Sequence, residues 1–366
     1  MPTLFEKVYG CLAASRVASA MGAAVEGWPA DKIVATYGFL DKFLPYTHYG
    51  YRGVTWQRMP GTTEDGIERQ KLMCQAIIEK QDRITVEDLA RVAVERVDPD
   101  KMWYMSEPDD IKLVQFLKAG IHPADVGGLS AWNGLNAMAR ASHPIGLINA
   151  GDPQGAVRDA ADVGRMLFRP ADGALAWAGV YDAAIAAAMW PGATVESVIE
   201  AVFEVLAGMK ARATHKSWYP DLIKSEIERA LAIVNRTDDY DKVRNELYTL
   251  YNGYGTPYAM SSAAETVSKA LAMFALSRGD ARTAVLYGVN LGRDTDCMAA
   301  MGGGLAGALS GIGAVPRDWV AQVDEATFAN PYTNLQVKIE EHARGVYGAI
   351  QSRARRMNEL AGILAG

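Results

Sequence analysis

Two short acidic motifs carry the residue types best suited to chemistry in this sequence. The later motif places Asp294 and Asp296 two residues apart, immediately before a stretch rich in glycine and alanine. The earlier motif is Thr63-Glu64-Asp65, which also stands just before a segment with helical spacing. Hard cations such as Mg²⁺, Mn²⁺ and Ca²⁺ prefer oxygen ligands of this kind. The two motifs therefore indicate a metal site if the fold brings them together.

Helix capping is the alternative use of both motifs. Threonine is a common N-cap residue, and acidic side chains in the first turn of a helix complement its dipole. Taken singly, each motif is better explained by capping. If the two helix ends converge, however, four carboxylates lie together, and their mutual repulsion requires either a cation or raised pKa values.

The elements that must position these motifs are predicted to be helices. Apolar residues recur at helical spacing through most of the chain, and no alternating strand pattern or fixed repeat stands out. Two aromatic-rich segments, 45–59 and 99–108, are predicted to be irregular loops that line a site. The chain is thus expected to be all-α, with residues 1–366 forming a single domain. The predicted helices are 67–79, 86–97, 154–168, 174–189, 195–206, 222–235, 240–251, 263–277, 281–289, 298–309 and 335–364.

The helix predicted over 298–309 is unusually rich in small residues. It contains Gly302, Gly303, Gly304 and Gly307, and each glycine costs a helix interior about 1 kcal/mol relative to alanine. That cost indicates close packing against another backbone. We therefore expect a buried central helix whose N-terminal end carries Asp294 and Asp296.

Composition narrows the class of protein. The 366 residues are 49% hydrophobic and carry a net charge of −6, which argues against a nucleic-acid-binding surface. No run of about 18 uninterrupted apolar residues is present, so no membrane span is expected. The three cysteines, Cys11, Cys74 and Cys297, are scattered and odd in number. They favour a reducing, cytoplasmic location over a disulfide framework.

The order and spacing of these motifs resemble the ADP-ribosylglycohydrolase family, which consists of all-α hydrolases that remove ADP-ribose from modified side chains. The family's Asn-x-Gly-Gly-Asp-Thr-Asp-Thr motif resembles the segment 290–308, and its Thr-Asp-Asp-Thr motif corresponds to 63–66. Its N-terminal glycine-alanine helix corresponds to 10–26, and its middle Asn-Gly-Met-Arg element to 133–146. The resemblance extends over about residues 5–320.

The resemblance implies a metal centre and a reaction. It implies one or two Mg²⁺ or Mn²⁺ ions that bind the ribose diol and polarise a water molecule near the anomeric carbon. N-glycosidic cleavage passes through an oxocarbenium-like state, so such a site must hold the sugar rigidly. The implied metal ligands are Thr63, Glu64, Asp65, Asp294, Asp296 and Cys297, of which Glu64, Asp65, Asp294 and Asp296 are also the implied catalytic residues.

Several positions depart from the family pattern. Glu64 stands where aspartate is usual, and Cys297 replaces a threonine, although a thiol is a poor partner for a hard cation. Gly66 removes a hydroxyl, and Arg293 replaces a glycine. Ala18-Ser19 stand in place of Gly-Asp. These changes predict a divergent branch, and they leave open a single metal ion, a different ribosyl substrate or the loss of catalysis.

Further residues are candidates for binding substrate. The segment 127–134 could present backbone amides to a phosphate at a helix start. Trp103 could stack on a base, although aromatic residues in helical proteins more often lie in the core. The residues expected to bind substrate are Gly128, Ser130, Asn133, Gly134, Trp103 and Arg293.

The sequence therefore predicts a metal-dependent hydrolase that cleaves an N-glycosidic bond to ribose in a ribosyl or ADP-ribosyl compound. The expected partners are a small-molecule or ADP-ribosylated substrate, without nucleic acid or membrane. Two alternatives remain. One is a small-molecule nucleosidase, and the other is a non-catalytic, crystallin-like relative that keeps the scaffold.

Overall fold

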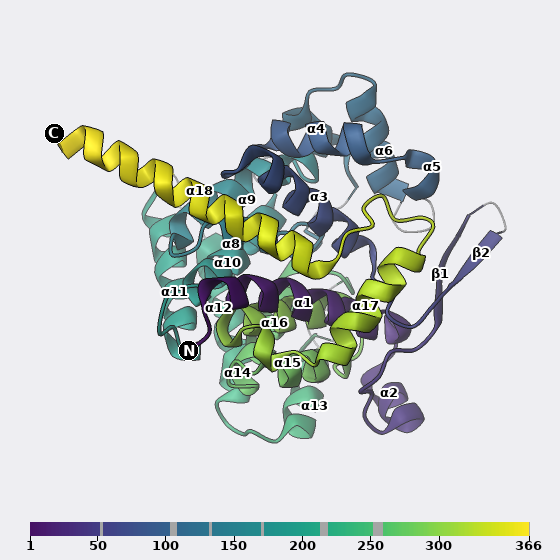
Figure 1. Cartoon of the computed structure of the whole chain (residues 1–366). Helices are drawn as coiled ribbons and strands as arrows, with labels where there is room; N and C mark the ends of the chain where they lie inside the picture. The colour runs from purple at the N-terminus through teal and green to yellow at the C-terminus, as the bar shows by residue number, and fades with distance from the viewer. Residues whose placement is uncertain are drawn as a thin grey trace.

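Two small-residue helices, α1 (Leu4–Gly22) and α16 (Thr295–Ser310), lie side by side in the middle of the molecule (Figure 1). The computed structural model describes residues 1–51, 54–102, 108–131, 134–169, 172–212, 219–251 and 259–365. Other helices surround this pair on several sides, so α16 is buried almost throughout its length. The prediction that the glycine-rich segment forms a buried central helix is confirmed.

Helix α1 begins with a local capping arrangement. Thr3 Oγ1 accepts a hydrogen bond from Glu6 N at 3.2 Å, and a Glu6 carboxylate oxygen accepts one from Thr3 N at 2.7 Å. The segment Leu4–Val25 is, within the described residues, the one helical stretch long and apolar enough to cross a membrane, judged by length and composition. Its most apolar window is 89% buried inside the protein, as expected for a core helix.

Glycine sets the distance between the two central helices. A Cβ atom built on Gly307 would lie 2.2 Å from Gly10 O, and one on Gly10 would lie 2.5 Å from Gly307 O. Real side chains do not approach so closely, so any larger residue would push the helices apart. The helix-breaking cost of the glycines is thus offset by close contact between two backbones.

Helices account for nearly all regular structure in the described residues, and the all-α prediction is confirmed. The α-helices of the first half are α2 (Ala30–Tyr37), α3 (Asp65–Lys80), α4 (Val86–Arg96), α5 (Pro99–Met102), α6 (Pro108–Lys118), α7 (Pro123–Val126), α8 (His143–Ile148) and α9 (Pro153–Val163). Those that follow are α10 (Gly173–Ala188), α11 (Val195–Arg212), α12 (Tyr219–Val234), α13 (Tyr240–Tyr251), α14 (Ala263–Leu276), α15 (Ala281–Val289), α17 (Arg317–Ala329) and α18 (Ile339–Ala365). Short 3-10 helices are η1 (Ala23–Val25), η2 (Gly127–Leu129), η3 (Gly164–Met166) and η4 (Ile312–Ala314).

One β-hairpin departs from the sequence prediction. Strands β1 (Tyr46–Tyr51) and β2 (Val54–Arg58) pair antiparallel and project from the helical body (Figure 1). The prediction that 45–59 is an irregular loop is therefore wrong over these strands. The register shifts between Thr47 and Gly50, which breaks the alternation that a sequence pattern needs. The second segment predicted to be irregular, 99–108, contains α5 and the first residue of α6, and 103–107 lies outside the described residues.

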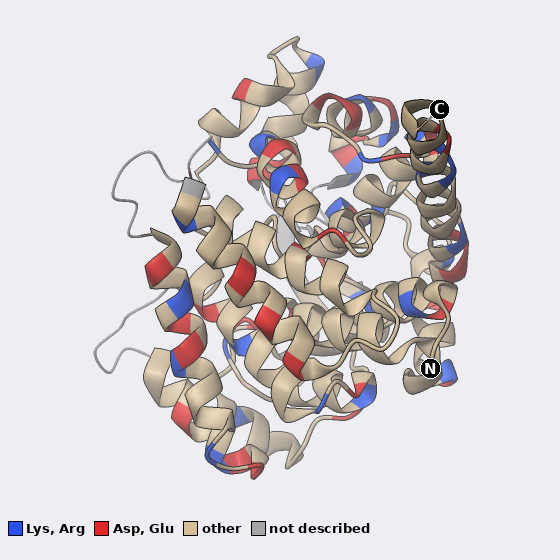
Figure 2. Cartoon of the chain, turned by 90° about the vertical axis from the view of Figure 1, so that its left-hand side faces the viewer, with Lys and Arg blue, Asp and Glu red and all other residues tan. Residues whose placement is uncertain are grey.

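The surface mixes both signs of charge. In the cartoon of Figure 2, acidic and basic residues are interspersed along the helices, and neither sign is confined to one part of the chain. The last helix, α18, extends beyond the body of the molecule and ends at the C-terminus (Figure 1). Neither feature lies at the meeting point of the acidic motifs.

The contact between α1 and α16 generates a stability prediction. We expect Gly307→Ala to lower the free energy of unfolding by about 2–3 kcal/mol, because the new methyl group overlaps a backbone that cannot move alone. Gly348→Ala on α18 is the matched control, since a Cβ there meets no atom within 4 Å. That control should be neutral or stabilising by up to about 1 kcal/mol. Thermal or urea unfolding measures both variants, and equal stability of the two would contradict this account of the helix contact.

Candidate metal centre

The structure brings the two acidic motifs together in the protein interior. Glu64 is the N-cap residue of α3 and Asp65 its first residue, while Asp294 is the N-cap residue of α16 and Asp296 lies in its first turn. All four side chains are at most 2% exposed. The side chains of Glu64 and Asp294 make no capping hydrogen bond to their own helices. Capping therefore does not explain the N-cap acid of either motif.

Helix α1 forms the third wall of the site through its last turns. A Cβ atom on Gly22 would lie 2.7 Å from Asp296 Cα, so the two backbones touch at this point. Thr295 Oγ1 donates a hydrogen bond to Gly22 O at 2.8 Å, and Glu64 N donates one to Ser19 Oγ at 3.3 Å. These contacts tie α1 to the first residues of both α3 and α16.

Glu26, just beyond η1, is a site residue to which the sequence analysis assigned no role. Its pKa is raised to about 9 by burial and by the neighbouring carboxylates of Asp294 and Glu64. Such a shift means that this group shares one dry, strongly negative environment with the two motifs. The signal in the sequence was its position at the end of the segment 10–26, which the family resemblance matched.

The motif at the start of α16, here called the α16 motif, consists of Asp294, Asp296 and Cys297 and offers the donor atoms of a cation site. One potential ligand atom from each of Asp294, Asp296 and Cys297 lies within 4.8 Å of the other two. Asn136 Nδ2 donates to Asp294 Oδ2 at 2.9 Å. Within the part of the chain that the structure describes, Asp294 Oδ1 and Asp296 Oδ1 are buried and have no hydrogen-bond partner. Burial, together with the carboxylates of Glu26 and Asp294, raises the pKa of Asp296 well above its usual value.

Cys297 is a poor metal ligand here for a physical reason. Burial, partly opposed by Arg140, raises the pKa of its thiol well above the usual value, so the thiolate form is disfavoured. Arg140 Nη1 lies 2.9 Å from Cys297 Sγ and donates a hydrogen bond to it. The thiol is therefore engaged by a guanidinium, and the oxygen atoms of Asp294 and Asp296 remain as the fitting donors for one hard cation.

The motif at the start of α3, here called the α3 motif, is Thr63-Glu64-Asp65. Arginine side chains neutralise the charge of its two carboxylates. Arg58 from β2 forms a buried ion pair with Glu64, and Arg140 forms one with Asp65. Arg69 Nη2 adds a second contact to Asp65 at 2.9 Å. Thr63 is buried directly before these acids. The two carboxylates of this motif thus already face cationic side chains.

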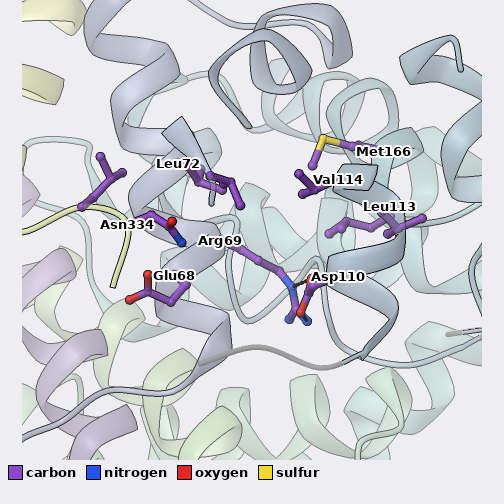
Figure 3. Close-up of a pocket in the computed structure, with 11 residues that line it drawn as sticks. Glu68, Arg69, Leu72, Asp110, Leu113, Val114, Met166 and Asn334 are labelled. Atoms are coloured by element: carbon purple, nitrogen blue, oxygen red, sulfur yellow. Dashed lines mark hydrogen bonds and ion pairs between the residues drawn. The ribbon is translucent and has the colours of Figure 1, made fainter. Parts of the chain in front are cut away.

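Arg69 also leads to a small cavity beside the site. Its guanidinium pairs with Asp110 at 2.6–2.7 Å, and both residues line the cavity together with Leu72, Leu113 and Met166 (Figure 3). The cavity volume of about 30 Å³ accommodates about two water molecules. It is therefore too small for a nucleoside.

Arg293 lies in the left-handed region at φ 65°, at the position where the family resemblance places a glycine. Its guanidinium forms a bidentate ion pair with the buried Glu265, in which Nε donates to Oε1 at 2.7 Å and Nη2 donates to Oε2 at 2.9 Å. Its backbone pairs with the loop after η1, since Gly27 N donates to Arg293 O at 2.7 Å and Arg293 N donates to Trp28 O at 2.8 Å. These bonds hold the strained residue that leads into Asp294.

The other residues predicted to bind substrate are spread over the neighbouring loops. Gly128 lies in η2 on the surface, and Ser130 follows that helix. Gly134 has φ 74°, and its amide already donates to Asp172 Oδ1 at 3.2 Å. Trp103 and Asn133 lie outside the described residues. The structure thus joins the predicted metal ligands and leaves the predicted substrate residues as predictions.

Comparisons with known proteins agree with this architecture. The uncharacterized protein YegU of Escherichia coli (strain K12) is 26% identical over 323 residues, which cover 87% of this chain and 92% of that protein. A solved structure described as an ADP-ribosylglycohydrolase-related protein complex has the same fold, with a TM-score of 0.62 at 17% identity over 96% of this chain and 99% of that chain. The family model described as ADP-ribosylglycohydrolase matches residues 1–356. Because that match spans nearly the whole sequence, the chain belongs to the ADP-ribosylglycohydrolase family.

Proposed function

We propose that this protein is a metal-dependent hydrolase that cleaves the N-glycosidic bond to ribose in a ribosyl or ADP-ribosyl compound. Membership of a family of glycosyl hydrolases supports the reaction class. The observation that supports metal dependence is the pair of buried carboxylates, Asp294 and Asp296. The Oδ1 atom of each has no hydrogen-bond partner in the described part of the chain.

A buried carboxylate with one oxygen left without a partner is costly, because burial removes the hydration of the charge. Asp294 and Asp296 would hold a divalent cation through their carboxylate oxygens, which would offset this cost. When bound, Mg²⁺ or Mn²⁺ supplies a Lewis acid that binds hydroxyl oxygens of a sugar and lowers the pKa of water. The donor chemistry favours these ions over softer metals, because the available donor atoms are oxygen.

Other side chains of the protein would orient these carboxylates and exchange protons. Asn136 fixes the Asp294 carboxylate, and Ser19 fixes the backbone before Asp65. Glu26, with its raised pKa, holds a proton at neutral pH in the metal-free protein. Glu26 lies beside the acids of both motifs, and a carboxyl group in such a position is suited to exchange a proton during glycosidic cleavage.

The buried, free cysteines support a reducing compartment for this activity. Cys11, Cys74 and Cys297 form no disulfide. We therefore extend the proposal to a cytoplasmic hydrolase whose partner is a small-molecule or ADP-ribosylated substrate.

The proposed activity predicts the effect of removing the metal carboxylates. Asp294→Asn and Asp296→Asn are each expected to lower kcat at least about 10³-fold, because the cation loses an anionic ligand while side-chain size is kept. Asp221→Asn on the surface of α12 is the matched control and should leave turnover unchanged. Turnover is measured by mass spectrometry on a panel of ribosyl and ADP-ribosyl compounds with added Mn²⁺ or Mg²⁺.

The outcomes of that screen separate the alternatives. Full activity in both site variants would overturn the proposal. Release of free base from nucleosides without action on ADP-ribosyl compounds would identify a small-molecule nucleosidase. A protein with no turnover and no bound or titratable divalent ion would instead be a non-catalytic relative.

The raised pKa of Glu26 predicts how stability depends on pH without a metal. Glu26 loses its proton near pH 4.5 when unfolded but only near pH 9 when folded, so the folded state binds the extra proton between these values. The free energy of unfolding of chelator-treated protein should therefore fall as pH rises from about 4.5 to about 9. Glu26→Gln should flatten this decline, and the exposed Glu200→Gln serves as the control. Chemical unfolding across this pH range measures the effect, and a stability that rises with pH in wild type but not in Glu26→Gln would contradict it.

A further inference from the structure

We infer that the Arg140 guanidinium takes the position of a second cation, so that this centre binds one divalent ion per chain and not two. The inference rests on the metal dependence proposed above, but not on the identity of the substrate. In this role Arg140 is a positioning residue that sets how many metal ions the site binds.

Arg140 bridges the two acidic motifs. Its Nη2 pairs with Asp65 from α3, and its Nη1 lies 2.9 Å from Cys297 Sγ and 3.9 Å from Asp296 Oδ2 on α16. The side chain is only 8% exposed. A guanidinium therefore stands between the two sets of acids, where a metal ion shared by both motifs would have to lie.

The backbone opposite Arg140 provides the room for this arrangement. A Cβ atom on Gly66 would lie 3.0 Å from Arg140 Cδ and 3.1 Å from Arg140 Cγ. A larger side chain at this position, such as the hydroxyl residue that the family resemblance places there, would press on the arginine. Gly66 is a departure from the family pattern, and the absence of a side chain there leaves space for Arg140.

Further arginine side chains engage the two carboxylates of the α3 motif, Glu64 and Asp65. Arg58 is fully buried and pairs with Glu64, and Arg69 contacts Asp65 from the next turn of α3. Each of these carboxylates thus has a guanidinium partner, and Asp65 has two. A second metal ion would have to displace Arg58 or Arg140 and then bind beside the remaining guanidinium groups, against their positive charge.

The α16 motif differs from the α3 motif, because no guanidinium forms a close ion pair with Asp294 or Asp296 among the described residues. Asp294 receives a hydrogen bond from Asn136, while Asp296 accepts one from Cys297 Sγ at 3.4 Å and lies 3.9 Å from Arg140. Among the described residues, the Oδ1 atoms of both aspartates are buried and lack a hydrogen-bond partner. Carboxylate oxygens of these two aspartates lie close enough to hold one cation together, so we expect a single ion.

Counting bound Mn²⁺ tests this inference without using any substrate. Wild-type protein equilibrated with Mn²⁺ and freed of excess should carry one ion per chain by elemental analysis, with the six-line electron paramagnetic resonance signal of an isolated ion. Arg140→Met removes the guanidinium that bridges Asp65 and the α16 motif, leaves Arg69 as the other partner of Asp65, and should raise the content to two ions with a spin-coupled signal. Arg140→Lys keeps the positive charge and should retain one.

Arg83→Met is the matched control, because it removes a guanidinium that pairs with Asp159 outside the site. It should bind one ion, as wild type does. Two ions or none in wild type would overturn the inference, as would a folded Arg140→Met protein that still binds one. If Arg140→Met does not fold, the wild-type content and signal alone decide. A protein that binds one ion but turns over no ribosyl compound would support this inference and contradict the proposed activity.

Discussion

The balance of charge among buried carboxylates is the constraint on which the rest of this structure depends. Glu64, Asp65, Asp294 and Asp296 converge where three helices meet, with the half-buried Glu26 beside them, and each of the four would be costly to bury without a partner. The chain meets this cost in two ways. Arginine side chains neutralise the acids at the start of α3, whereas the acids at the start of α16 keep unpartnered oxygens, within the described residues, that fit one hard cation.

The helices achieve this convergence through contacts between backbones. Gly22 lets the end of α1 touch Asp296, and the pairing of Gly10 with Gly307 fixes the same two helices further along. Glycine is unfavourable in each helix on its own. The small residues are therefore explained by the position that they give to the acids and not by helix formation. Arg293 adds to this arrangement, because its strained backbone turns the chain into Asp294 while Glu265 holds its side chain.

Local sequence predicted much of the fold, and tertiary contacts account for most of what it missed. The bounds of α13 and α15 match the prediction, since capping and periodicity there are local. Helix α18 begins at Ile339 and not at 335, because Asp324 from α17 accepts a hydrogen bond from Ile339 N at 2.9 Å. The hairpin was missed because its strands pair only with each other across an irregular register. In the site, the acids were visible as motifs, but the roles of Glu26 and Arg140 arise from contacts with distant residues, and Arg58 is positioned by the hairpin that the sequence did not predict.

X-ray diffraction from crystals soaked in Mn²⁺, with anomalous data collected at the manganese absorption edge, tests the central claim most directly. The account predicts one anomalous peak within bonding distance of the carboxylates of Asp294 and Asp296, with Arg140 still bridging Asp65 and the α16 motif. A peak between Glu64 and Asp65 with Arg140 displaced, or the absence of any peak at the α16 motif in fully soaked crystals, would contradict it.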